Sequence, residues 1–279
     1  MTYRTLISAV QLSERQKAAD LIVVDCRYDL MDAEAGHRDW LSGHIPGAVY
    51  ASVSHDLSSK PVTDHGRHPM PSPETMIKTF SKLGIDSSKQ VVVYDNAGGA
   101  FAARLWWMLR YMGHDAVAVL DGGWPAWQAL GLKEATGEEL NVATQFIGSA
   151  RPEQLVLLAD VMTSALLVDS RDPDRYQGKL EPIDPAAGHI PGAKNHFWKL
   201  NLDASGQFLP EDKLADQFTK LMGTTTSDDV VFYCGSGVTA CHNVLAVTHA
   251  GLSEPRLYGG SWSEWSADKT RPVATGDAP

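Results

Sequence analysis

The sequence repeats itself, and this repeat limits the folds open to the chain more than any single segment does. Four motifs of the first half return in the same order in the second half. Their offsets run from 138 residues, from Trp124 to Trp262, to 145 residues, from Gly43 to Gly188. The matched segments are 21–27 with 166–171, 43–48 with 188–193, 91–95 with 230–234, and 124–127 with 262–265. The chain is therefore predicted to contain two copies of one domain of roughly 130 residues.

Each copy alternates short apolar runs with helical patterns, which predicts an α/β fold with a mostly parallel sheet flanked by helices on both faces. We expect strands at 21–26, 48–52, 91–95, 116–120, 166–170 and 229–233. We expect helices at 72–84, around 102–109, and at 124–130, 158–165, 210–222 and 239–250. The polar stretch from Gly131 to Ala143 has no strong periodicity. We place the domains at 1–135 and 144–279, with 136–143 as the linker.

Cys234 follows the buried run 230–233 and precedes a helical pattern, so it is expected at the end of a parallel strand. Ligands of open α/β sheets bind at that edge. The intervening loop consists of small residues whose backbone N–H groups can converge on one point, namely Gly235, Ser236, Gly237, Val238 and Thr239. Together with the positive end of the helix, they favour a thiolate. An isolated cysteine is more often a core residue, but this context favours a nucleophile.

The two copies differ at the position of Cys234, where the first copy has Asp95 followed by the loop 96–99. A carboxylate cannot perform the nucleophilic sulfur chemistry of a thiolate. The second copy is therefore expected to carry the reaction, while the first keeps the fold and can supply one wall of a cleft.

Composition restricts the partners and the compartment. The chain has 279 residues, 43% of them hydrophobic, and a net charge of −10, which argues against nucleic acid or an anionic membrane as a partner. Three cysteines in a chain of this size do not suggest a disulfide framework. We find neither a convincing signal peptide nor an apolar run of about 18 residues, and we expect a cytoplasmic protein. The Cys241–His242 pair matches no usual zinc spacing, so we predict no metal site and expect Cys241 in a helix core.

Motifs present in both copies are predicted to be structural. His44 and His189 each precede an Ile-Pro-Gly turn, and their rings are expected to bond the turn backbone. Asp25 and Asp169 each stand two residues before an arginine at a strand end, which suggests ion pairs that stabilise the fold.

The repeat, both His-Ile-Pro-Gly motifs and the loop Cys-Gly-Ser-Gly-Val-Thr-Ala at 234–240 make nearly the whole chain resemble the two-domain rhodanese-like sulfurtransferases. The loop is most similar to that of the 3-mercaptopyruvate enzymes. The resemblance implies a persulfide on Cys234, a small anionic sulfur donor, and cyanide or a thiol such as a thioredoxin-like protein as acceptor, with no cofactor. It also implies that Arg175 binds the anionic end of the donor and that Ser236 relays a proton.

Two departures leave the donor open. Ile183 stands where the resembled enzymes have a second arginine, and Ser54 stands where they have an aspartate that partners the loop serine. The segment 66–71 is more similar to bacterial thiosulfate-type enzymes, so thiosulfate is the alternative donor. A persulfide carrier without turnover is a further alternative. A Cys-x5-Arg phosphatase is disfavoured, because Ala240 occupies the position of its arginine.

Overall fold

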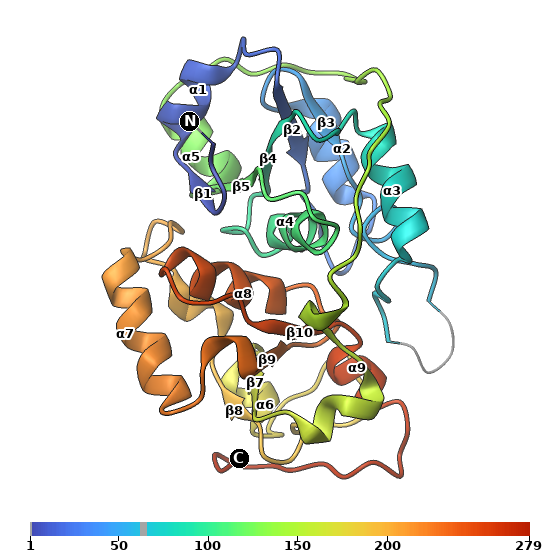
Figure 1. Cartoon of the computed structure of the whole chain (residues 1–279), viewed down its shortest axis with the longest axis vertical. Helices are drawn as coiled ribbons and strands as arrows, with labels where there is room; N and C mark the ends of the chain where they lie inside the picture. The colour runs from blue at the N-terminus through green and yellow to red at the C-terminus, as the bar shows by residue number, and fades with distance from the viewer. Residues whose placement is uncertain (1, 62–65) are drawn as a thin grey trace. The chain divides into compact units, whose positions relative to one another are not determined.

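The computed structural model describes residues 2–61 and 66–279, and it divides the chain into two compact units (Figure 1). Unit 1 comprises Met1–Ser59, Pro71–Arg151 and Ala204–Phe208. Unit 2 comprises Lys60–Met70, Pro152–Asp203 and Leu209–Pro279. The described residues 60–61 and 66–70 belong to the first copy by sequence but pack within unit 2. The predicted domain 1–135 also includes residues 1 and 62–65, which lie outside the described residues.

Unit 1 contains a five-stranded sheet in the order β1-β5-β4-β2-β3, with every neighbouring pair parallel. Its strands are β1 (Leu6–Ile7), β2 (Leu21–Asp25), β3 (Ala48–Tyr50), β4 (Gln90–Tyr94) and β5 (Val117–Leu120). Its helices are α1 (Ala9–Arg15), α2 (Ala35–Ser42), α3 (Pro73–Lys82), α4 (Ala102–Tyr111) and α5 (Gly123–Ala129). Ser72 caps α3 by accepting the amide of Thr75, and Pro73 lies in the first turn of this helix.

Unit 2 repeats this topology in the order β6-β10-β9-β7-β8, again with parallel pairs. Its strands are β6 (Leu155–Val156), β7 (Leu166–Asp169), β8 (Lys194–Asn195), β9 (Val230–Tyr233) and β10 (Arg256–Tyr258). Its α-helices are α6 (Pro173–Tyr176), α7 (Glu211–Met222), α8 (Ala240–His249) and α9 (Ser261–Trp265). Four 3-10 turns, η1 to η4, span Pro152–Gln154, Leu158–Thr163, Trp198–Asn201 and Ser227–Asp229. The matching strand orders confirm the two α/β copies predicted from the repeat.

Each sheet separates two apolar layers, because successive side chains of a strand point to opposite faces. In unit 1, alternate residues of β4 such as Val92 and Tyr94 pack with Leu12 of α1 and Trp127 of α5. Helices α1 and α5 lie side by side (Figure 1), and α4 packs on β4 and β5. In unit 2, residues of β9 and β10 pack with Trp262 and Trp265 of α9, and α8 packs on the same strands.

Two local predictions need correction. The helix predicted at 158–165 is shorter and of the 3-10 type: η2 ends at Thr163, and Ser164 after it is extended. The rings of His44 and His189 do not bond the Ile-Pro-Gly turns. Instead, their Nδ1 atoms lie 2.7 Å from the carbonyl oxygen of Trp40 and 2.8 Å from that of Tyr176. These histidines therefore attach each turn to the helix before it, a contact that the repeat alone does not reveal.

The predicted ion pairs are confirmed. Arg27 donates to both carboxylate oxygens of Asp25, and Arg171 to both of Asp169, and all four side chains are buried. Each guanidinium also donates to a carbonyl, of Gly43 or Gly188, beside the adjoining histidine. These pairs anchor the chain after β2 and β7. Cys241 is fully buried in α8, as predicted.

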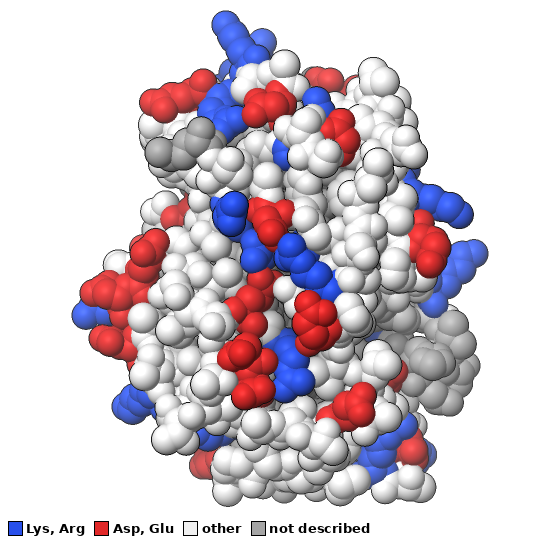
Figure 2. All heavy atoms as spheres, viewed as in Figure 1, with Lys and Arg blue, Asp and Glu red and all other residues white. Residues whose placement is uncertain are grey.

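Acidic and basic side chains are interspersed on the face that Figure 2 shows. None of the helices in the described part of the chain is long and apolar enough to span a bilayer.

Candidate active site

Cys234 directly follows β9, as predicted, and its side chain is almost completely buried. The start of α9 secures the peptide groups of this residue. The amide of Cys234 donates to Oγ of Ser261 at 3.1 Å, and its carbonyl accepts the amide of Trp262 at 3.0 Å. Ser261 has φ 55°, an uncommon conformation for a residue other than glycine. The position of Cys234 thus depends on a strained serine that sequence analysis did not identify.

The loop from Cys234 to Thr239 requires its second glycine. Gly237 has φ +74°, and a β-carbon added there would lie 2.1 Å from the carbonyl oxygen of Gly259. Val238 is buried, and Thr239 flanks the first residue of α8, although its side chain does not cap the helix. The predicted strand–loop–helix arrangement around Cys234 is confirmed, with the helix beginning at Ala240.

The equivalent loop of unit 1 shows what this arrangement binds. Asp95 follows β4 as Cys234 follows β9, and its carboxylate accepts four backbone amides. Oδ1 accepts from Ala97 and Gly99 at 2.8 and 2.9 Å, and Oδ2 accepts from Phe101 and Ala102 at 2.8 Å each. The loop amides of unit 1 therefore converge on an anion, as backbone nests do.

In unit 2 the amide of Cys241, the counterpart of Ala102, donates to the carbonyl oxygen of Val238 at 3.2 Å, and the other three corresponding amides have no acceptor among the described residues. The N–H groups of Ser236, Val238 and Ala240 make no hydrogen bond to any residue that the structure describes. Because buried amides are nearly always paired, this loop offers donors to a group on Cys234. The sequence prediction of converging amides is thus supported by the internal comparison with Asp95.

Ser236 is paired with a residue that sequence analysis did not select. Its Oγ lies 2.8 Å from Nδ1 of His68, and both side chains are buried. The sequence pattern of the segment 66–71 assigns no role to His68. Ser54 stands where the resembled enzymes have the aspartate that partners the loop serine, and its Oγ lies 2.7 Å from the hydroxyl of Tyr28 within unit 1.

Arg175 lies in the turn of α6 and is only 17% exposed. Its Nε and Nη2 donate to Glu181, and Nη2 also donates to Asp184 at 3.0 Å. Burial alone would raise the pKa of Glu181, but the hydrogen bonds from Arg175 and from the amide of Asp184 outweigh it and hold this pKa below its ordinary value. The Arg175 guanidinium is therefore fixed by hydrogen bonds to two acidic side chains.

Arg175 also lies close to the active loop. A β-carbon added to Gly235 would be 3.7 Å from its Nη1 and Nη2, and 2.8 Å from Nη2 of Arg67. Ile183, by contrast, is 40% exposed, and its amide donates to Glu181. Two arginines therefore lie next to the residue after Cys234, although the segment with Ile183 lacks the expected one.

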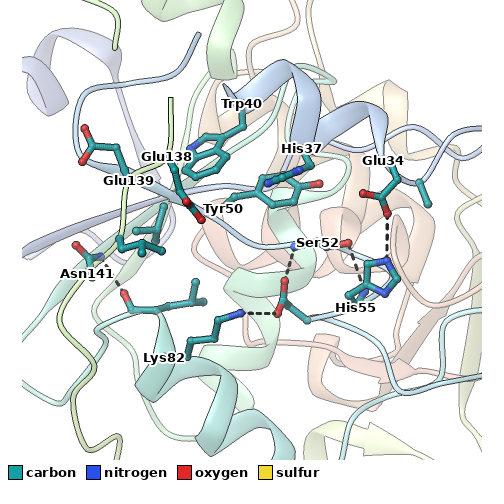
Figure 3. Close-up of a pocket in the computed structure, with 15 residues that line it drawn as sticks. Glu34, His37, Trp40, Tyr50, Ser52, His55, Lys82, Glu138, Glu139 and Asn141 are labelled. Carbon is teal, nitrogen blue, oxygen red and sulfur yellow. Dashed lines mark hydrogen bonds and ion pairs between the residues drawn. The ribbon is translucent and has the colours of Figure 1, made fainter. Parts of the chain in front are cut away.

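Unit 1 contains a separate cavity of about 330 Å³. The rings of Trp40 and Tyr50 stack there with centroids 5.8 Å apart, and Glu34 and Glu138 also line the cavity (Figure 3). Its described lining residues include no cysteine or arginine. It therefore lacks both residue types that the predicted sulfur chemistry requires.

All three cysteines are free thiols. Burial raises the pKa of the Cys26 thiol well above its ordinary value, so this residue is not a competing nucleophile. Among residues 2–61 and 66–279, no group of three or more His, Cys, Asp or Glu side chains is arranged to hold a metal ion.

Comparison with known proteins agrees with this geometry. Residues 8–130 and 153–268 each match the Rhodanese-like domain. A Pseudomonas aeruginosa protein provisionally named 3-mercaptopyruvate sulfurtransferase is 44% identical over 99% of this chain and 100% of its own length. A Mycobacterium tuberculosis protein provisionally named thiosulfate sulfurtransferase SseB is 38% identical over 99% of this chain and 98% of its own length.

The solved structure of the Escherichia coli 3-mercaptopyruvate sulfurtransferase covers 94% of this chain and 100% of that chain, with 30% identity and a TM-score of 0.80. The family match spans both halves of the repeat, and each half contains the same parallel five-stranded sheet. The chain therefore belongs to the rhodanese-like family and contains two of its domains.

Proposed function

We propose that the protein is a sulfurtransferase that moves a sulfur atom from 3-mercaptopyruvate to a thiol or cyanide through a persulfide on Cys234. Three features support this function: a cysteine at the end of β9, loop amides without acceptors, and a fixed arginine beside the loop. The names of the relatives from Pseudomonas aeruginosa and Escherichia coli point to the same donor.

In the first step the Cys234 thiolate attacks the donor sulfur. A sulfur–sulfur bond forms, the carbon–sulfur bond of 3-mercaptopyruvate breaks, and the electron pair leaves on carbon as the enolate of pyruvate. The enolate takes up a proton to give pyruvate, and the donor thiol loses one, so the net product is the persulfide anion. The loop amides of Ser236, Val238 and Ala240 are placed to stabilise that anion.

The pair of Ser236 and His68 is the observation that carries the choice of donor. With 3-mercaptopyruvate, a proton must move from sulfur to carbon, whereas thiosulfate releases sulfite without any proton transfer. A serine hydroxyl 2.8 Å from a histidine nitrogen, two residues after Cys234, supplies such a relay. We assign Ser236 and His68 to this transfer, and Arg175 to the donor carboxylate.

In the second step the acceptor attacks the outer sulfur, the sulfur–sulfur bond breaks, and the Cys234 thiolate is regenerated. Cyanide then leaves as thiocyanate, and a thiol leaves as a persulfide. A thioredoxin-like protein is the macromolecular acceptor that we propose, and the cytoplasm is the reducing compartment that suits three free cysteines.

The proposed donor is tested by steady-state kinetics with 3-mercaptopyruvate and with thiosulfate, using cyanide as acceptor. We expect a higher kcat/KM for 3-mercaptopyruvate. In Ser236→Ala we expect its kcat to fall about a hundredfold, since a proton relay is lost, while thiosulfate turnover is unchanged. Equal losses with both donors would remove the argument for 3-mercaptopyruvate. Sulfur loading without turnover would instead identify a carrier.

Arg175→Ala is expected to raise the KM for the donor by about tenfold to a hundredfold, the equivalent of one charge-assisted hydrogen bond. Its kcat should change much less, because the interaction is present before the sulfur moves. Arg175→Lys should recover part of the loss. Arg38, which pairs with Asp32 on the surface of unit 1, provides the control Arg38→Ala. An unchanged KM in Arg175→Ala would place the anion site elsewhere.

A further inference from the structure

Arg67 shares a buried carboxylate with the proposed donor-binding arginine. Its Nε and Nη2 donate to the two oxygens of Asp184 at 2.9 and 3.1 Å. Nη2 of Arg175 donates to the same Oδ2 at 3.0 Å. The side chain of Asp184 is only 1% exposed, so the carboxylate is committed to these two cations. Asp184 therefore couples the position of Arg67 to that of Arg175.

The surrounding charges balance without a ligand. Arg67, Arg171 and Arg175 face the carboxylates of Asp169, Glu181 and Asp184. Two guanidinium groups at close range repel each other, and the shared carboxylate offsets this repulsion. The cluster thus holds Arg67 and Arg175 together on one side of the active loop, beside Gly235.

Both arginines keep a donor available. Nη1 of Arg67 and Nη1 of Arg175 make no hydrogen bond to any residue in the described part of the chain. Their side chains are 29% and 17% exposed, so a small solute can reach them. Guanidinium N–H groups bind carboxylates better than they bind water in such half-buried positions.

We propose that Arg67 is a second ligand for the anionic end of the donor and acts together with Arg175. This inference rests on the proposed function, because it assigns a substrate contact at the same site. The proposed donor, 3-mercaptopyruvate, is a 2-oxo acid with a carboxylate and a neighbouring carbonyl oxygen. These two groups offer one acceptor each to Nη1 of Arg67 and Nη1 of Arg175. The second cation thus comes from the first sequence copy, 117 residues before Asp184, and not from the segment that contains Ile183.

A purely structural role for Arg67 is the competing explanation, since its backbone amide also donates to Oγ of Ser263 at 3.1 Å. In that case Arg67 and Asp184 would only attach the segment 66–70 to unit 2. The two roles differ in what they predict for anion affinity. If Arg67 is structural, its substitution lowers the stability of the protein. If Arg67 binds the donor, its substitution weakens anion binding at constant stability.

The test uses the full chain with Arg67→Ala, Arg67→Gln and Arg67→Lys, and with Arg38→Ala as control. For Arg67→Ala and Arg67→Gln we expect the KM for 3-mercaptopyruvate to rise about tenfold, the loss of one charge-assisted bond. The change in kcat should stay within about threefold. Arg67→Lys should show a smaller rise, since it keeps the charge but not the planar fork.

Calorimetric titration with pyruvate measures the anion site without turnover. We expect the Kd for pyruvate to rise in parallel with the KM in Arg67→Gln and to stay constant in Arg38→Ala. A lower melting temperature of Arg67→Gln with an unchanged Kd would overturn the inference and leave Arg67 structural. Absence of turnover in the wild type, together with weaker pyruvate binding in Arg67→Gln, would refute the sulfurtransferase but retain the anion site.

Discussion

Cys234→Ser is expected to abolish sulfur transfer from both 3-mercaptopyruvate and thiosulfate. The rate should fall by several orders of magnitude, roughly as when other covalent nucleophiles are removed. A serine hydroxyl remains protonated at neutral pH, and a neutral hydroxyl is a poor nucleophile. The substitution changes one buried atom, and the backbone bonds of residue 234 to Ser261 and Trp262 remain available. The loss of activity should therefore occur without a loss of stability.

The matched control is Cys26→Ala. Cys26 is fully buried beside Asp25 in unit 1, and its raised pKa keeps the thiol protonated. We expect this variant to retain its kcat at temperatures where it is folded. Mass spectrometry after treatment with donor should detect one added sulfur atom in the wild type and in Cys26→Ala, but none in Cys234→Ser. Sulfur found on Cys26 or Cys241 would contradict the mechanism.

The position of Cys234 is predictable from sequence because the signals that specify it are local. The apolar run 230–233 gives the strand, the small residues give the loop, and the helical pattern gives α8. The repeat adds the comparison with Asp95, which separates the two copies. A strand end and a helix start are formed by neighbouring residues, so periodicity is sufficient to place them.

Arg67 and His68 escape this kind of analysis because their partners are distant in sequence. Arg67 contacts Asp184 across 117 residues, and His68 contacts Ser236 across 168. Both belong to the first copy by sequence, but they pack within unit 2. No periodic pattern specifies a short segment that leaves its own copy.

Asp95→Asn is expected to destabilise unit 1 strongly, although we do not expect Asp95 to take part in sulfur transfer. The carboxylate accepts four amides, two on each oxygen, and it is almost completely buried. An asparagine has one acceptor oxygen, and its NH2 group would face two N–H donors. Two buried amides lose their partner, at about 1–3 kcal/mol each, so the free energy of unfolding should fall by about 2–6 kcal/mol.

Asp29→Asn provides the matched control, since this exposed carboxylate accepts the backbone amide of Met31. Asp29→Asn should lower the free energy of unfolding by less than about 1 kcal/mol. Denaturant unfolding measures the free energy of unfolding of each variant. Hydrogen exchange locates the destabilised region, and in Asp95→Asn exchange should accelerate most at the amides of residues 97–102. A stable Asp95→Asn variant would show that the loop keeps its shape without an anion.

The Asp95 result bears directly on the chemistry of Cys234. The carboxylate oxygens of an aspartate stand two bonds from Cβ, and so does the outer sulfur of a cysteine persulfide. The carboxylate of unit 1 therefore occupies the position that the transferred sulfur would take in unit 2. If the loop of unit 1 needs its anion for stability, the loop of unit 2 should be more stable as the persulfide than as the free thiol. Protection of the amides of Ser236 and Val238 should then increase when the donor loads Cys234, and no increase is expected in Cys234→Ser.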